Sequence, residues 1–177
     1  MKCFILTGAP GAGKTAILRQ LEHDGFGVVE EAATDVIALE QSKGIAEPWR
    51  DPAFIDLVVD LQKRRQLRMA QAPDAVQFHD RSVVCTAALA DFLGYPLSGR
   101  LSRELLRIER EDIYQKRVFL VRSLGFIKAT EARRISYEEA QRFEKTHEKA
   151  YRERGFDIVP IEPGSVLDRA AAIRGAL

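Results

Sequence analysis

The feature that most constrains the fold is the stretch 2–23, where an apolar run, a glycine-rich turn and a helical pattern follow one another. Between the run and the helix, residues 8–15 read GAPGAGKT and fit the pattern G-x-x-x-x-G-K-[ST]. Glycines allow positive φ angles and close approach, so that backbone N–H groups can converge on a phosphate chain. The helix that follows would point the unpaired N–H groups of its first turn at the same charge. The sequence therefore predicts a phosphate-binding loop, or P-loop, on the first strand-to-helix turn of an α/β fold.

The residue types of this loop predict a nucleotide and Mg²⁺ as ligands. Lys14 is expected to reach the β- and γ-phosphates, where it would also stabilise charge during catalysis, and the Thr15 hydroxyl is expected to coordinate Mg²⁺. The alternative is a chance match in a glycine-rich loop, which the position between a strand and a helix disfavours. The predicted nucleotide-binding residues are Gly8, Ala9, Pro10, Gly11, Ala12, Gly13, Lys14, Thr15 and Ala16.

Strand-like and helical patterns alternate along the rest of the chain. Continuous apolar β-rich runs are typical of parallel strands that are buried on both faces. The expected strands are residues 2–7, 27–31, 75–80, 117–121 and 156–162. The expected helices are residues 14–23, 34–43, 52–71, 83–92, 101–110, 136–154 and 166–174. We therefore predict one α/β domain over residues 1–177, a P-loop NTPase three-layer sandwich with a five-stranded parallel sheet, of nucleotide-kinase-like type.

Charge and cysteine content limit the partners and the compartment. The 177 residues include 27 Lys and Arg against 26 Asp and Glu, a net charge of +1 that predicts no nucleic-acid partner. The first apolar run stops at Thr7 and is too short for a membrane span or a signal segment. Cys3 and Cys85 lie in apolar surroundings and are expected to be buried free thiols. We therefore expect a cytoplasmic protein, and no pattern specifies its oligomeric state.

Polar residues follow the predicted strands at the sheet edge where ligands bind in open α/β folds. Asp80 fits a carboxylate that holds Mg²⁺ directly or through water, although it could instead cap the next helix. Arg81 could clamp a phosphate or a substrate anion, or be a surface arginine, whereas His79 is expected to face away. Of the adjacent Glu30 and Glu31, only one can face the γ-phosphate as a general base, and we choose Glu31.

Basic segments offer further candidates. The polar, basic stretch at about 122–136 is expected to be a lid over the phosphates, with Arg133 as the arginine that stabilises transferred charge; a solvated loop is the alternative. Lys63, Arg64, Arg65 and Arg68 cluster on one predicted helix and favour a solvated face over a substrate-phosphate site. Trp49 and Phe54 are expected to belong to the core rather than to stack on a substrate.

Taken together, GAPGAGKT, VVEEAATDVI, HDRS, ARRISYEEA and YRERGFDIVPIEP resemble the small P-loop proteins known as predicted AAA-type ATPases, which are nucleoside- and nucleotide-kinase-like and related to the nicotinamide riboside kinase domain. The resemblance implies a five-stranded parallel sheet, ATP or GTP with Mg²⁺, and a lid. It also implies functional roles for Glu31, Asp80, Arg81 and Arg133. The chain departs from the family pattern at Thr34, where an arginine is usual, and at Glu131, where an aspartate is usual.

Two classes of function fit these residues. The first is an ATP-dependent kinase for an unidentified small-molecule acceptor, which needs an enclosed polar pocket beside the γ-phosphate. The second is a nucleotide-gated switch or slow NTPase whose lid changes between triphosphate and diphosphate and is read by a partner. No Asn/Thr-Lys-x-Asp guanine-reading motif is present, which favours ATP while leaving GTP possible. The base is expected near residues 162–165.

Overall fold

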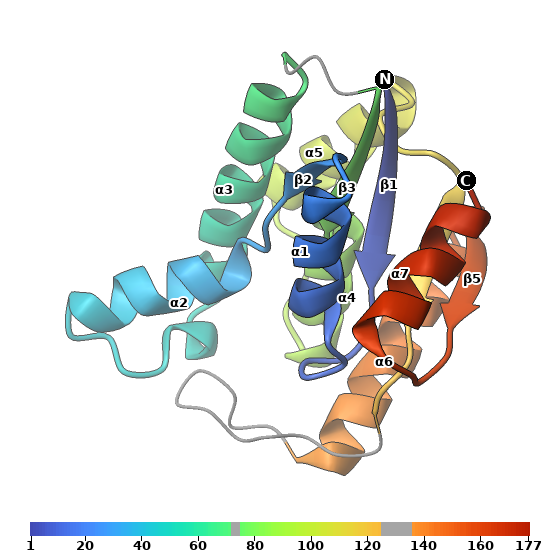
Figure 1. The fold of residues 1–177 in the computed structure, drawn as a ribbon. Coiled ribbons are helices and arrows are strands. Elements are labelled where there is room, and N and C mark those ends of the chain that lie inside the picture. The colour runs from blue at the N-terminus through green and yellow to red at the C-terminus, as the bar shows by residue number, and fades with distance from the viewer. Residues whose placement is uncertain (72–74, 125–135) are drawn as a thin grey trace.

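A computed structural model describes residues 1–71, 75–124 and 136–177 (Figure 1). Within them, five strands form one sheet in the order β2-β3-β1-β4-β5, and every pairing is parallel. The strands are β1 (Lys2–Thr7), β2 (Gly27–Val29), β3 (Val76–Asp80), β4 (Arg117–Val121) and β5 (Asp157–Ile161). The predicted five-stranded parallel sheet of an α/β sandwich is confirmed. Because β1 is central, the loop that follows it lies at the middle of the carboxyl edge of the sheet.

Helices cover both faces of this sheet. They are α1 (Lys14–His23), α2 (Ala33–Ser42), α3 (Ala53–Met69), α4 (Val83–Phe92), α5 (Gly99–Arg110), α6 (Tyr137–Arg152) and α7 (Val166–Gly175), with a short 3₁₀ helix η1 (Pro48–Arg50). Along β1, Phe4 and Leu6 pack in one core cluster with residues of α1 and α7. Cys3 and Ile5 pack in a second cluster with residues of α3, α4 and α5. A strand that is apolar on both sides therefore becomes the centre of three layers.

The order of strands and α-helices agrees with the sequence prediction. The differences lie at element ends and in the 3₁₀ helix η1, which forms where the sequence indicated a loop. Ser98 caps α5 by accepting a hydrogen bond from the Leu101 N–H, so this helix starts two residues before its predicted start, in what the sequence indicated as a turn. The capping box of Ser136 and Glu139 forms as predicted at the start of α6. The strand predicted to reach Glu31 ends at Val29, so Glu30 and Glu31 lie in a connection rather than in the sheet.

Cys3 and Cys85 are both buried and free, as predicted. Among the helices in the described ranges, none combines the length and the hydrophobicity required to cross a bilayer.

Gly8 is a residue at which the P-loop approaches the sheet closely. Its φ is +132°, and a Cβ added there would lie 2.3 Å from the carbonyl oxygen of Val121 at the end of β4. Gly44 provides a matched control, since its φ is +93° but no atom lies within 4 Å of the added Cβ. We expect Gly8→Ala to lower the free energy of unfolding by about 3 kcal/mol and Gly44→Ala by about 1 kcal/mol. Urea unfolding measures both, and equal losses would contradict the close approach.

Candidate active site: a P-loop and the pocket beside it

The loop between β1 and α1 has the backbone that its glycines predict. Gly8, Gly11 and Gly13 all have positive φ angles, and Gly13 directly precedes the first residue of α1. The Lys14 ammonium donates hydrogen bonds to the carbonyl oxygens of Gly8, at 3.2 Å, and Ala9, at 2.9 Å. Its residue is only 6% exposed. The loop and its lysine therefore have the geometry of an anion-binding turn at a helix N-terminus.

Burial governs the protonation of Lys14. Burial and, to a smaller extent, the positive charge of Arg81 lower the pKa of Lys14 to about 8, although Asp80 and Glu31 act in the opposite direction. Lys14 is therefore charged at neutral pH and loses its charge as the pH rises through 8.

This titration predicts a pH dependence of nucleotide affinity. Above pH 8 the dissociation constant of a non-hydrolysable ATP analogue should rise by up to about tenfold per pH unit, because the triphosphate stays ionised while the Lys14 ammonium is lost. Calorimetric titrations between pH 7 and 9.5 measure this. Lys14→Arg keeps its charge over the whole range and should remove the dependence. If the dissociation constant of Lys14→Arg rose with pH as steeply as that of the wild type, a group other than Lys14 would be the one that titrates.

Arg81 follows β3 in an unusual backbone conformation. Its φ is +73°, a left-handed value that costs a non-glycine residue about 1–2 kcal/mol, and its N–H donates to the Leu6 carbonyl oxygen at 2.9 Å. Strain of this kind is typical of functional sites. The side chain of Ser82 caps α4, so the alternative that Asp80 caps this helix is wrong. Asp80 is buried at the end of β3, level with Leu6 of β1.

The Arg81 guanidinium joins three elements around the site. Its Nε donates to Glu31 Oε1 at 2.7 Å, and its Nη1 lies 3.2 Å from His147 Nε2 on α6. The guanidinium also lies 5.9 Å from the ring centroid of Phe143. Burial lowers the pKa of His147 well below its usual value, and the neighbouring Arg81 and Lys14 lower it further. A neutral His147 can therefore accept a hydrogen bond from Arg81, so the arginine is buried and held rather than exposed at the surface.

The two adjacent glutamates have different surroundings. Glu31 lines the pocket and also accepts a hydrogen bond from the Thr34 hydroxyl at 3.1 Å. Glu30 pairs with Arg19 at the surface instead. Burial acts to raise the pKa of Glu31, but Arg81 and Lys14 outweigh it and hold the pKa below its usual range. Glu31 is therefore a carboxylate able to accept a proton, and Thr34, where the resemblance implies an arginine, is one of its partners.

A pocket of about 600 Å³ extends from the P-loop into the space between α2, η1, α3, α4 and α6. Its P-loop end, beside the expected position of the γ-phosphate, is polar, whereas its inner end is mostly apolar and aromatic. Within the inner end, Thr86 Oγ1 donates to Gln62 Oε1 at 2.7 Å. The residues lining that end are Ile37, Trp49, Phe54, Val58, Gln62, Thr86, Leu89, Phe92, Leu93 and Phe143.

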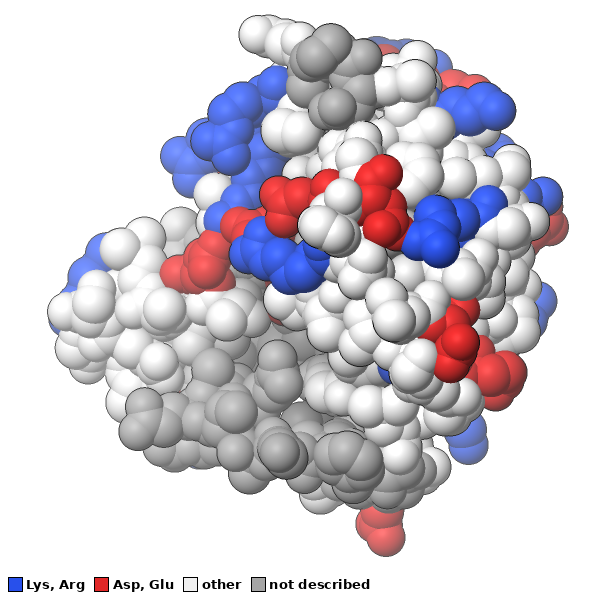
Figure 2. Space-filling model, in the orientation of Figure 1, with Lys and Arg blue, Asp and Glu red and all other residues white. Residues whose placement is uncertain are grey.

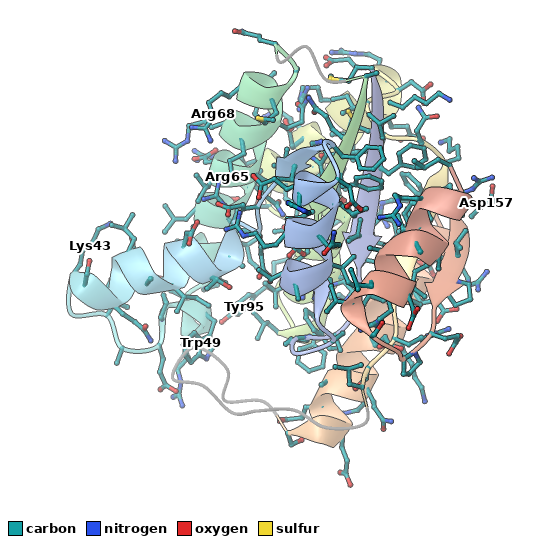
Figure 3. The ribbon with its side chains drawn as sticks, in the orientation of Figure 1. Lys43, Trp49, Arg65, Arg68, Tyr95 and Asp157 are labelled. Carbon is teal, nitrogen blue, oxygen red and sulfur yellow. The ribbon has the colours of Figure 1, made fainter. Side chains whose placement is uncertain are left out.

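Trp49 and Phe54 belong to the core, as expected, and they also line the pocket. The Tyr95 hydroxyl donates to the Trp49 carbonyl oxygen at 3.0 Å and fixes η1 beside the pocket (Figure 3). These two aromatic side chains therefore form a wall that is supported from behind by the core.

Other predicted residues lie elsewhere. His79 is buried edge-on to Tyr114, with ring centroids 5.1 Å apart, and does not line the pocket, as expected. Arg122 pairs with Glu144 and Glu148 of α6. Arg133, Glu131 and most of the predicted lid lie outside the described residues.

Sequence reasoning missed His147, Gln62, Thr86 and Phe92 as pocket residues. A signal existed for His147, because Ala140, Phe143 and His147 recur at helical spacing on the inner side of α6. No such signal existed for Gln62, Thr86 and Phe92, because the packing of each helix decides which of its sides faces the pocket.

Comparisons with known proteins identify the family and the fold of this chain. A family model described as an AAA domain (AAA_28) matches residues 3–169. A comparison with curated proteins finds no match. One similar structure is deoxyadenosine kinase from M. mycoides with the products dCMP and a flexible dCDP bound, with a TM-score of 0.63 and 14% identity over 98% of this chain and 97% of that one.

Two structures of NadR are also similar. The complex with NAD and AMP-PNP has a TM-score of 0.70 and 17% identity, and the complex with NR has a TM-score of 0.72 and 18% identity. Each covers 99% of this chain, which spans about half of NadR, at 48% and 49%. At these identities the likeness concerns the fold. The family match covers nearly the whole chain, and the chain therefore belongs to the AAA_28 family of AAA domains, with a small P-loop fold like that of nucleotide kinases.

Proposed function

We propose that this protein is a Mg²⁺- and ATP-dependent kinase that transfers the γ-phosphoryl group to a hydroxyl of a nucleoside-like acceptor. The observation that carries the proposal is the pocket that continues from the P-loop into an aromatic chamber, with Glu31 and Arg81 beside the P-loop end. A nucleotide-gated switch has no need of such a second chamber next to its phosphate site.

The chemistry of the chamber supports a flat, uncharged ring as the body of the acceptor. Trp49, Phe54 and Phe92 offer apolar and aromatic surface of the kind that binds planar rings. Gln62 and Thr86 are polar groups in the same wall and would hydrogen-bond to heteroatoms of the ring. Among the described lining residues, the cations are Lys14 and Arg81, and both would be taken up by the phosphates of ATP at the P-loop end. An acceptor with its own phosphate would lack a free partner among these residues.

The reaction assigns a role to each residue of the P-loop end. Glu31 takes the proton of the acceptor hydroxyl as the new O–P bond forms and the bond between the γ-phosphorus and the β–γ bridging oxygen breaks, leaving ADP. Lys14 and Arg81 offset the charge on the transferred phosphoryl group, and Arg133 would add to this from the lid. Thr15 and Asp80 would hold Mg²⁺, whose ligands in such sites are one or two carboxylates with hydroxyl and phosphate oxygens. Bound Mg²⁺ supplies charge neutralisation on the phosphates.

The proposal is tested by measuring ADP or GDP release from Mg·ATP and Mg·GTP with a panel of acceptors. The panel contains deoxyadenosine, deoxycytidine, adenosine and nicotinamide riboside, together with their monophosphates and free sugars. We expect one nucleoside to raise turnover from ATP well above the rate with water, while monophosphates and sugars do not. Slow turnover that no acceptor raises would reject the kinase in favour of a nucleotide-gated switch.

A further inference from the structure

Arg65 of α3 makes contacts that distinguish it from the other basic residues of its helix. Its Nη1 donates to the carbonyl oxygens of Glu30, at 3.1 Å, and Glu31, and its Nη2 pairs with the Asp35 carboxylate in the first turn of α2. The Arg65 side chain is 16% exposed. It does not line the pocket. Arg65 therefore hydrogen-bonds to the backbone of the connection that carries Glu31, from outside the pocket.

The neighbouring basic residues are different. Arg64 and Arg68 are exposed on the outer side of α3, where Figure 2 shows a gathering of basic side chains. Figure 3 labels Arg65 and Arg68 on this helix. One residue of the predicted basic cluster thus faces inward to the β2–α2 connection, while two others face solvent.

In the described chain, the β2–α2 connection is not held by strand pairing, so the hydrogen bonds from Arg65 are important for its position. The strand β2 lies at the edge of the sheet and pairs with β3 only through Gly27, Val28 and Val29. Beyond Val29 no strand pairing holds the described chain until α2 begins at Ala33. The guanidinium of Arg65, with donors in a fixed planar fork, can hold two carbonyl oxygens and a carboxylate at once.

We propose that Arg65 is a positioning residue for the Glu31 carboxylate, acting through the backbone of the β2–α2 connection without contact to the acceptor. This inference rests on the proposed function of Glu31 as the base. The base must lie within about 2.6–3.2 Å of the proton that it takes. Arg81 and Thr34 hold the carboxylate from the pocket side, and Arg65 holds its backbone from the other side. Loss of either support would displace the carboxylate.

The kinetic test compares Arg65→Lys and Arg65→Met with the control Arg68→Met, using the nucleoside of the panel that gives the highest turnover. Arg65→Lys keeps the positive charge but lacks the planar guanidinium, whose several N–H donors hold the two carbonyl oxygens and the carboxylate together. Both Arg65 variants should therefore lower kcat by about 10- to 100-fold. The KM for ATP should stay within about twofold, since the P-loop is untouched. In a Glu31→Gln background, Arg65→Met should change kcat by less than about threefold, because two residues that act through one group are not additive.

Hydrogen exchange provides a second readout that needs no acceptor. In Arg65→Met, backbone amides of residues 28–36 should exchange about tenfold faster, because charge-assisted hydrogen bonds to that segment are lost. Exchange in the P-loop should be unaltered, and Arg68→Met should match the wild type throughout.

The outcomes test the positioning role of Arg65 and the proposed kinase function separately. Unaltered exchange in residues 28–36, an equal loss of kcat in Arg68→Met, or a full loss of kcat on top of Glu31→Gln would overturn the positioning role. If no nucleoside raises wild-type turnover, the proposed kinase function fails. The exchange experiment then still decides whether Arg65 holds the segment that carries Glu31.

Discussion

Lys14→Ala is expected to lower kcat/KM for ATP by at least about 10²- to 10³-fold, the loss seen when one preorganised charge stabiliser is removed. Lys14 is the cation of the P-loop itself, and its ammonium lies within hydrogen-bonding distance of the Gly8 and Ala9 carbonyl oxygens. When a triphosphate binds, the same ammonium would turn to the β- and γ-phosphates. Without it, the loop retains its N–H groups but loses the charge that the transferred phosphoryl group requires. Initial rates at varied ATP concentration measure the effect.

The control for this variant is Lys2→Ala, an exposed lysine at the start of β1 that should leave the kinetics unchanged. Thermal unfolding of both variants separates a loss of chemistry from a loss of the fold. Because the Lys14 ammonium is buried and is repelled by the positive charge of Arg81, replacing Lys14 with Ala should lower the free energy of unfolding only slightly. Wild-type turnover in a folded Lys14→Ala protein would refute the nucleotide site.

Glu31→Gln is expected to reduce acceptor-dependent turnover by about 10²- to 10⁴-fold, the range typical of a lost general base. The change keeps the size of the side chain and its ability to accept a hydrogen bond from the Thr34 hydroxyl. It removes the negative charge that pairs with Arg81 and the ability to take a proton. Affinity for a non-hydrolysable ATP analogue should change little, so the loss should appear in kcat.

The matched control is Glu30→Gln, the same change one residue earlier. Glu30 lies half-exposed, paired with Arg19 at the surface, so its substitution should leave turnover within about twofold, as surface ion pairs contribute little. Equal losses in the two variants would mean that the connection as a whole, rather than the Glu31 carboxylate, matters. Full activity of Glu31→Gln would remove Glu31 from the mechanism.

Much of the fold could be predicted because its signals are local. The P-loop is a contiguous pattern whose glycines must take positive φ angles, and they do so at Gly8, Gly11 and Gly13. Helix α4 and strand β4 begin and end where their apolar patterns predict, and Ser136 and Ser165 cap their helices as expected. Alternating strands and helices allow few arrangements besides a parallel sheet with both faces covered.

The orientation of neighbouring side chains was harder to predict. Strand alternation predicts that only one of Glu30 and Glu31 faces the site, yet β2 ends at Val29 and both residues lie beyond it. Their opposite directions come from separate partners, Arg81 for Glu31 and Arg19 for Glu30. Among the basic residues at 63–68, only packing of α3 against the β2–α2 connection turns Arg65 inward.

The sequence by itself determined the phosphate-binding loop, the order of strands and helices and the class of fold, because each depends on residues close together in the chain. Only the tertiary structure decided that Arg81 meets both Glu31 and His147, and that residues from α2, η1, α3, α4 and α6 line one pocket. Those contacts join residues 50 or more positions apart. They depend on how whole helices pack on the sheet, and a local pattern carries no information about that packing.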